Sequence, residues 1–209
     1  MKPSIPHKPT HPLQRLRHQI ASEAARIIVE DGLQDYRLAK EKAMRHLALG
    51  DGHWEALPSN AEVMAEITLR LRLFRGDSHP AQLQHLRELA LQVMGQLQTF
   101  APRLVGAVLA GAVTAHTDLQ LHLFADTPED LSFFMLDQGI AYQEGVQSLR
   151  FAQGHRQIPV IHFIHSEVPV HCAIFSSDEH EVPLSAVTGK AMQRARHKQV
   201  ALLLRPENT

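Results

Sequence analysis

The sequence predicts an α+β fold, in which an N-terminal helical region precedes a mixed β-sheet with flanking helices. Apolar residues recur at helical spacing from Leu13 to Phe100, and after Pro102 they alternate with the period of two typical of strands. Proline, glycine and capping residues mark the ends of these segments. We therefore expect a proline-rich flexible arm over residues 1–12, a helical region over 13–79, and an α/β core with a basic C-terminal segment over 80–209.

Four helices are expected in the first half of the chain. Their expected limits are Leu13 to Gly32, Asp35 to Gly50, Leu57 to Phe74 and Pro80 to Phe100. Asp35 is a favourable N-cap for the second helix, and Ser59 and Glu62 have the spacing of a capping box in the third. Acidic and basic residues alternate over the first two helices, so we expect no sequence-specific DNA binding by a helix-turn-helix.

The sequence of the second half of the chain predicts four strands, with one clear helix between the second and the third. Strands are expected over residues 103–109, 117–124, 158–165 and 167–175, and the last two could pair as a tight hairpin around Ser166. Thr127 and Pro128 begin a helix that stops at Gly139. The helix expected over Pro80 to Phe100 would lead into the first of these strands.

Composition sets limits on the class of protein. The 209 residues carry a net charge of -1, which predicts no general attraction to nucleic acid or acidic membranes. No apolar segment is long enough to span a membrane, so the expected compartment is the cytoplasm. The fifteen histidines are scattered, without the spacing of a zinc protease motif, and the single cysteine, Cys172, is expected to be a buried thiol.

The most specific chemical signal lies between Gly106 and Leu121, where the chain reads GAVLAGAVTAHTDLQL. A glycine turn is followed twelve residues later by Asp118 at the start of an alternating strand. This segment resembles the signature of the nucleotidyltransferase superfamily, in which a Gly-Ser turn, a short helix and a D-h-D-h strand follow one another. Matches fall at Gly106, Gly111, Thr117 and Asp118. Two positions depart from the signature, because Ala107 replaces the serine and Gln120 replaces the second carboxylate.

The resemblance implies a nucleotidyltransferase core over residues 80–176 and a site for Mg²⁺ and a nucleoside triphosphate. Asp118 and Gln120 would be the catalytic positions, with Gln120 degenerate, and His171 would stand where the third acid is expected. Gly106, Ala107 and Gly111 would form the phosphate-binding turn. Asp118 and His122 would be the metal-binding positions. The loss of two acids weakens a Mg²⁺ site, and Zn²⁺ or Mn²⁺ is the less favoured alternative.

Two functions from different classes follow. The first is a bacterial nucleotidyltransferase-like protein that binds a nucleotide or phosphate, with weakened or lost Mg²⁺-dependent transfer. The alternative is a non-catalytic interaction module that uses its helical half and proline-rich arm to contact a protein partner or itself. The basic residues near the C-terminus, Arg194, Arg196, His197 and Lys198, are expected to form either a solvated helix face or a rim that touches phosphates.

Overall fold

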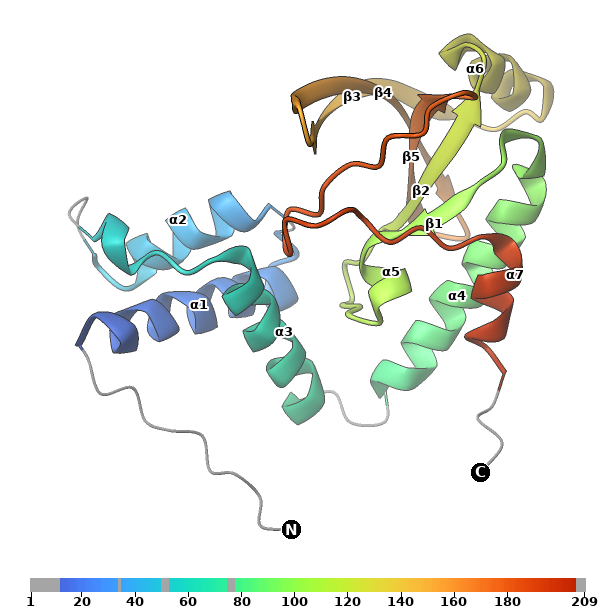
Figure 1. Cartoon of the computed structure of the whole chain (residues 1–209). Helices are drawn as coiled ribbons and strands as arrows, with labels where there is room; N and C mark the ends of the chain where they lie inside the picture. Colours follow the sequence, from blue (N-terminus) through green and yellow to red (C-terminus); the bar gives the residue numbers. More distant parts are fainter. Residues whose placement is uncertain (1–11, 34, 50–52, 75–77, 206–209) are drawn as a thin grey trace. The chain divides into compact units, whose positions relative to one another are not determined.

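The computed structural model describes residues 12–33, 35–49, 53–74 and 78–205, and within these it confirms an α+β fold. The predicted arm lies outside the described residues except for Pro12, which begins the first helix. The chain forms two compact units, residues 1–75 and 76–209, which are described separately (Figure 1).

The first unit is helical. It contains α1 (Pro12–Glu30), α2 (Tyr36–His46), the short 3₁₀ helix η1 (Trp54–Ala56) and α3 (Asn60–Phe74). Its buried residues include Ile20, Ala24 and Ile27 of α1. Asp35 caps α2 by accepting hydrogen bonds from the amides of Arg37 and Leu38, and Ser59 and Glu62 make the expected reciprocal bonds before α3.

The end of α2 differs from the prediction. The helix ends at His46 rather than near Gly50 because Ala48 adopts a left-handed backbone with φ of 53°. The amide of Leu49 then donates to the carbonyl of Met44 (3.0 Å) and satisfies a group at the helix end. The sequence contains no glycine at this position that would have indicated the stop.

The second unit contains a mixed sheet. Its elements are α4 (Ser78–Gln96), η2 (Gln98–Phe100), β1 (Arg103–Val105), α5 (Gly106–Ala110), β2 (Leu119–Ala125), α6 (Pro128–Asp137), β3 (Tyr142–Phe151), β4 (Gly154–His165), β5 (Val168–Ser176) and α7 (His197–Leu202). The strand order is β1-β2-β5-β4-β3, with β2 and β5 parallel and the other neighbours antiparallel. The hairpin expected around Ser166 is formed by β4 and β5.

Two strand predictions need correction. The first strand stops at Val105, four residues before its expected end, because Gly106 takes a φ of +72° and starts α5. The sequence prediction missed β3 entirely. Most of its residues are exposed and few are apolar, since it lies at the edge of the sheet, so the apolar alternation that indicates a half-buried strand is weak there.

The two faces of the sheet are covered differently. One face carries Leu119, Leu121 and Leu123 of β2 and belongs to the main core, which includes residues of α4 and α6. The other face carries a smaller cluster that includes Phe151 and Phe175.

The chain after β5 bonds to both edges of this sheet. The amide of Leu184 donates to the carbonyl of Arg150 on β3 (2.7 Å), and Ala195 exchanges two backbone hydrogen bonds with Leu104 on β1 (2.8 and 2.9 Å). Figure 1 shows this segment as the orange-red trace between β5 and α7. Because Leu184 and Ala195 bond to the two opposite edge strands, the segment between them must cross the width of the sheet.

Because Leu121 lies in the main core, shortening its side chain should strongly lower the stability of the protein. We expect Leu121→Ala, at a side chain 1% exposed, to lower the free energy of unfolding by about 2–5 kcal/mol. The control Leu136→Ala removes the same atoms from a side chain 63% exposed in the same unit, and should change it by less than about 0.5 kcal/mol. Urea unfolding followed by circular dichroism compares the two, and equal effects would contradict the assignment of Leu121 to the core.

Candidate functional site

Three polar side chains lie in one row across the sheet. Gln120 on β2 is paired with His171 on β5, and His171 is paired with His162 on β4. Paired residues on neighbouring strands point to the same face, with Cβ atoms about 5 Å apart. The register therefore brings two of the expected site residues, Gln120 and His171, side by side and adds His162, which the sequence prediction missed.

Asp118, His171 and His162 form a continuous hydrogen-bonded chain. Nε2 of His171 lies 3.1 Å from Oδ2 of Asp118, and Nδ1 of His171 lies 2.7 Å from Nδ1 of His162. Because the two Nδ1 atoms face one another, one of them carries the proton and the other accepts it. Burial, and then the charge of His171, lower the pKa of His162, while Asp118 opposes this shift. The carboxylate of Asp118 is thus already in contact with an imidazole of the chain itself.

The loop before β2 fixes the backbone at Asp118. Oγ1 of Thr117 accepts a hydrogen bond from the amide of Thr114 (2.7 Å), and the amide of Thr117 donates to the Thr114 carbonyl (3.2 Å). Gln82 on α4 donates to the same carbonyl (2.6 Å) and ties the loop to the helix. Thr117, which matches the small hydroxyl position of the signature, therefore closes the turn that leads into Asp118.

Gln120 occupies the space beside the glycine turn. A Cβ atom added to Gly106 would lie 2.4 Å from Oε1 of Gln120, far closer than van der Waals contact. Ala107 is part of α5 and offers only a methyl group, and Gly111 ends that helix with a φ of +77°. A ligand that approached Gly106 from this side would therefore have to displace the amide of Gln120.

His122 was expected to bind a metal ion together with Asp118, but its side chain contacts Arg194 instead. Its Nδ1 accepts a hydrogen bond from Nε of Arg194 (2.9 Å), and its ring centroid lies 4.7 Å from that of Phe175. The side chain is 3% exposed, and burial, helped by the charge of Arg194, lowers its pKa to about 3. His122 is therefore a neutral, buried residue, and of the two histidines it is His171 that contacts Asp118.

The buried state of His122 predicts a pH-dependent stability. Unfolding returns its pKa from about 3 to the ordinary value of 6.5, so the unfolded chain binds a proton that the folded chain does not bind between these values. Its contribution is complete above pH 6.5 and is lost progressively as the pH falls toward 3. Between pH 7 and pH 5 the expected loss is about 2 kcal/mol.

The variant His122→Asn isolates this effect, because asparagine offers an acceptor to Arg194 but does not titrate. Denaturant unfolding at several pH values should give a stability that falls by about 2 kcal/mol less over this range in the variant than in the wild type. Parallel pH profiles for the two proteins would contradict the depressed pKa.

The residues around Asp118 fit a Mg²⁺ ion poorly. Asp118 is engaged by His171, and the one oxygen that Gln120 can offer lies beside Gly106. Mg²⁺ prefers carboxylate oxygens, and it is bound through one or two of them together with substrate phosphates. In the described parts of the chain, no group of three or more His, Cys, Asp or Glu side chains is arranged to hold a metal ion.

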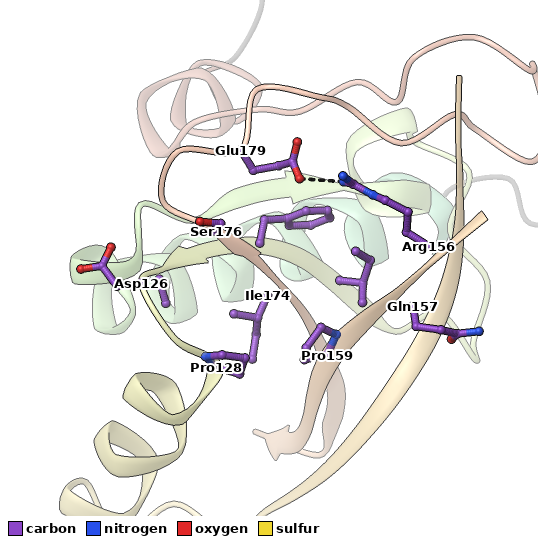
Figure 2. A pocket seen from close by; sticks show the side chains of 11 residues that line it. Asp126, Pro128, Arg156, Gln157, Pro159, Ile174, Ser176 and Glu179 are labelled. Carbon is purple, nitrogen blue, oxygen red and sulfur yellow. Dashed lines mark hydrogen bonds and ion pairs between the residues drawn. The ribbon is translucent and has the colours of Figure 1, made fainter. Parts of the chain in front are cut away.

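A cleft of about 330 Å³ lies at the other end of β2 and β5. Figure 2 shows Asp126 and Ser176, which follow and end these parallel strands, on one side of it, and Arg156 paired with Glu179 at its upper edge. Oε2 of Glu179 accepts from Arg156 at 2.7 Å. The cleft begins at Ala125, the last residue of β2, whereas Asp118 precedes the first, so the predicted site and the cleft do not coincide.

Comparison of the chain with protein-family models, curated proteins and solved structures finds no match. None of the helices in the described residues is long and apolar enough to cross a membrane.

Proposed function

We propose that this chain is a nucleotidyltransferase-like protein that binds a nucleotide or another phosphate-bearing ligand, with weakened or lost Mg²⁺-dependent nucleotidyl transfer. The contact between Asp118 and His171 is the observation that carries this proposal. Nucleotidyl transfer needs a divalent cation between protein carboxylates and substrate phosphates. In this site the single carboxylate is paired with an imidazole, so the attraction that would hold the cation is reduced.

Two further features support the proposal. The glycine turn and Asp118 belong to neighbouring segments, because Val105, which precedes Gly106, is paired with Gln120 in the sheet. The elements β1, α5, β2, α6, β4 and β5 follow the order strand, short helix, strand, helix, strand, strand that the resemblance implies, with β3 added before β4. A scaffold of this kind with a changed charge at its centre favours binding over catalysis.

Calorimetric titration of the full chain with the four nucleoside triphosphates, with and without Mg²⁺, tests the proposal. We expect binding that Mg²⁺ strengthens by less than about tenfold, because the cation gains only one carboxylate already in use. Asp118→Ala should abolish any Mg²⁺ dependence, whereas Asp137→Ala, at an exposed residue of α6, serves as the matched control. Rapid Mg²⁺-dependent turnover would show that catalysis is intact and overturn this part of the proposal.

A second function, a protein-interaction module, is favoured by the outer edge of β3. The carbonyl of Arg150 accepts a hydrogen bond from Leu184, which lies outside the sheet. Every second residue before Arg150 in β3 therefore also points its peptide groups outward, away from β4. Among the described residues, no segment pairs with the edge from Tyr142 to Ser148. Val146, at its centre, is 67% exposed. Long open edges of this kind are templates for strand pairing.

We propose a second copy of the chain as the partner for this edge. An antiparallel pair centred on Gly145 places Glu144 opposite the partner's Val146 and Tyr142 opposite the partner's Ser148, so the outward peptide groups of the two open edges match one another. Analytical ultracentrifugation should detect a dimer that Val146→Pro dissociates, because proline removes an outward donor. Val146→Thr, which keeps the outward amide donor, is the matched control. A monomer at all concentrations would exclude this pairing.

A further inference from the structure

Three arginines converge where the C-terminal segment meets β1 and β2. Arg103 lies on β1, and Arg194 and Arg196 flank Ala195, which pairs with the same strand. The guanidinium carbons of Arg103 and Arg194 lie 5.6 and 5.3 Å from the ring centroid of Phe124, and that of Arg194 lies 4.9 Å from the ring of Phe175. Arg194 is therefore a half-buried residue stacked on the sheet, not part of the solvated helix face expected from the sequence.

The charges of these arginines are not met by acidic side chains. Among the described residues, none of the three forms an ion pair within 4.0 Å. Arg103 donates to the backbone carbonyls of Ala101 and Pro102. Nε of Arg194 donates to the neutral His122, and its Nη2 is buried without an acceptor. The protein thus leaves part of the hydrogen-bonding capacity of this cluster unused.

The nearest acid does not remove this excess of positive charge. Glu179 attracts Arg194, but its carboxylate is already bonded to Arg156 at 2.7 Å. Arg196 and Arg103 repel one another, as do Arg103 and Arg194, and these repulsions add to the effect of burial in lowering the pKa values of Arg103 and Arg194. Groups that repel one another at partly buried positions are stabilised by an anion that lies between them.

We propose that Arg103, Arg194 and Arg196 form a binding site for a phosphate group. Guanidinium groups present several N–H donors in a plane, and a phosphate has enough oxygens to accept from more than one of them. The phosphate can come from inorganic pyrophosphate or from a nucleotide, and the two sources share this chemistry. Asp118 directly precedes β2, and His122, which binds Arg194, lies four residues later, or ~13 Å along an extended strand, so this site is separate from the one around Asp118.

Titration of the full chain with pyrophosphate at low ionic strength is the primary test. We expect Arg103→Gln and Arg194→Gln each to weaken binding by about tenfold or more, because each removes a charge-assisted bond. Arg196→Gln, at an exposed residue, should weaken it by about threefold and leave folding unchanged. The matched control Arg150→Gln makes the same charge change at an exposed residue of β3 and should have no effect.

Thermal unfolding of each variant separates loss of binding from loss of the fold. At the same concentration, pyrophosphate should raise the unfolding temperature of the wild type and of Arg150→Gln by more than that of Arg103→Gln. If Arg194→Gln does not fold, Arg103→Gln and Arg196→Gln decide the outcome. Absence of pyrophosphate binding by the wild type, or equal binding by Arg103→Gln and the wild type, would overturn the site.

Parallel titrations with ATP and adenosine identify the source of the phosphate. ATP binding that is tighter than pyrophosphate binding and equally sensitive to Arg103→Gln assigns a nucleotide, whereas tighter pyrophosphate binding assigns the inorganic ion. Adenosine, which lacks phosphate, should not bind at this site. Loss of ATP binding in Asp118→Ala together with full binding in the arginine variants would refute this site and leave the function proposed above intact.

Discussion

The double substitution Gln120→Asp and His171→Asp should create a divalent-cation site beside Asp118. The pairing of Gln120 with His171 places the two new carboxylates side by side on one face of the sheet, next to the acid that the chain already has. His171→Asp also removes the imidazole that now engages Asp118. We expect the variant to bind Mn²⁺ at least about tenfold more tightly than the wild type, because carboxylates are the preferred ligands of hard cations.

The same variant should depend on the cation for its stability. Three neighbouring carboxylates repel one another, so the variant should unfold at a lower temperature than the wild type in the presence of a chelator and recover when Mn²⁺ is added. Electron paramagnetic resonance of free Mn²⁺ gives the affinity. Gln143→Asp is the matched control, since Gln143 lies in the same row but three strands from Gln120, or about 14 Å at ~4.8 Å per strand.

A folded double variant that binds Mn²⁺ no more tightly than Gln143→Asp would contradict the placement of Gln120 and His171 at acid positions. The proposal of a nucleotidyltransferase-like site would then lose its main support. Each single substitution should give an intermediate affinity, because each restores one of the two missing charges. This series therefore measures how much of the lost metal binding is due to each position.

Gly106→Ala is expected to be one of the most destabilising substitutions in the site. The φ of +72° is unfavourable for any residue with a side chain, and the added Cβ would lie 2.4 Å from Oε1 of Gln120. The backbone strain should lower the free energy of unfolding by about 1–2 kcal/mol, and the contact should add less than this, because Oε1 is the end of a flexible side chain that can move away. Denaturant unfolding of the purified variant measures the loss.

Two further variants separate the two effects. Gly139 has a similar φ of +65° but nothing within 4 Å of an added Cβ, so Gly139→Ala should show the backbone strain alone, about 1–2 kcal/mol. Adding Gln120→Ala to Gly106→Ala should restore the part of the loss that is due to contact. If Gly106→Ala and Gly139→Ala cost the same, the amide of Gln120 gives way to the methyl group without measurable cost. A Gly106→Ala variant as stable as the wild type would contradict the left-handed backbone at this position.

Local patterns in the sequence predicted most of the helices and the strands with a buried face. Asp35, Ser59 with Glu62, and Thr127 mark the starts of helices through bonds to amides within the next turn, so short segments are sufficient to predict them. The strand β3 was missed because an edge strand gains its conformation from pairing with β4 and needs no apolar face of its own. The early end of α2 was missed because Ala48 takes a backbone conformation for which alanine has no preference.

The arrangement of side chains around Asp118 was predicted in part. Asp118 and His171 were expected to lie near one another and are in contact, and His162 could have been found from the hairpin, since a two-residue loop at Ser166 and Glu167 pairs it with His171. The position of Gln120 against Gly106 could not have been found in this way. It depends on how β1 and β2 pair and on a side-chain conformation that no sequence spacing specifies.

The sequence by itself determined the α+β class, the order of most elements and which residues of β2 alternate between the two faces of the sheet, because these follow from local propensity and from the period of each element. Only the tertiary structure decided what each face contacts. The polar face of β2 was expected to carry metal-binding positions at Asp118 and His122. The chain after β5 instead bonds to both edges of the sheet, and Arg194 in it stacks on Phe124 and binds His122. His122 is consequently buried and neutral, because burial depends on segments that are distant in the sequence, and residue spacing carries no information about them.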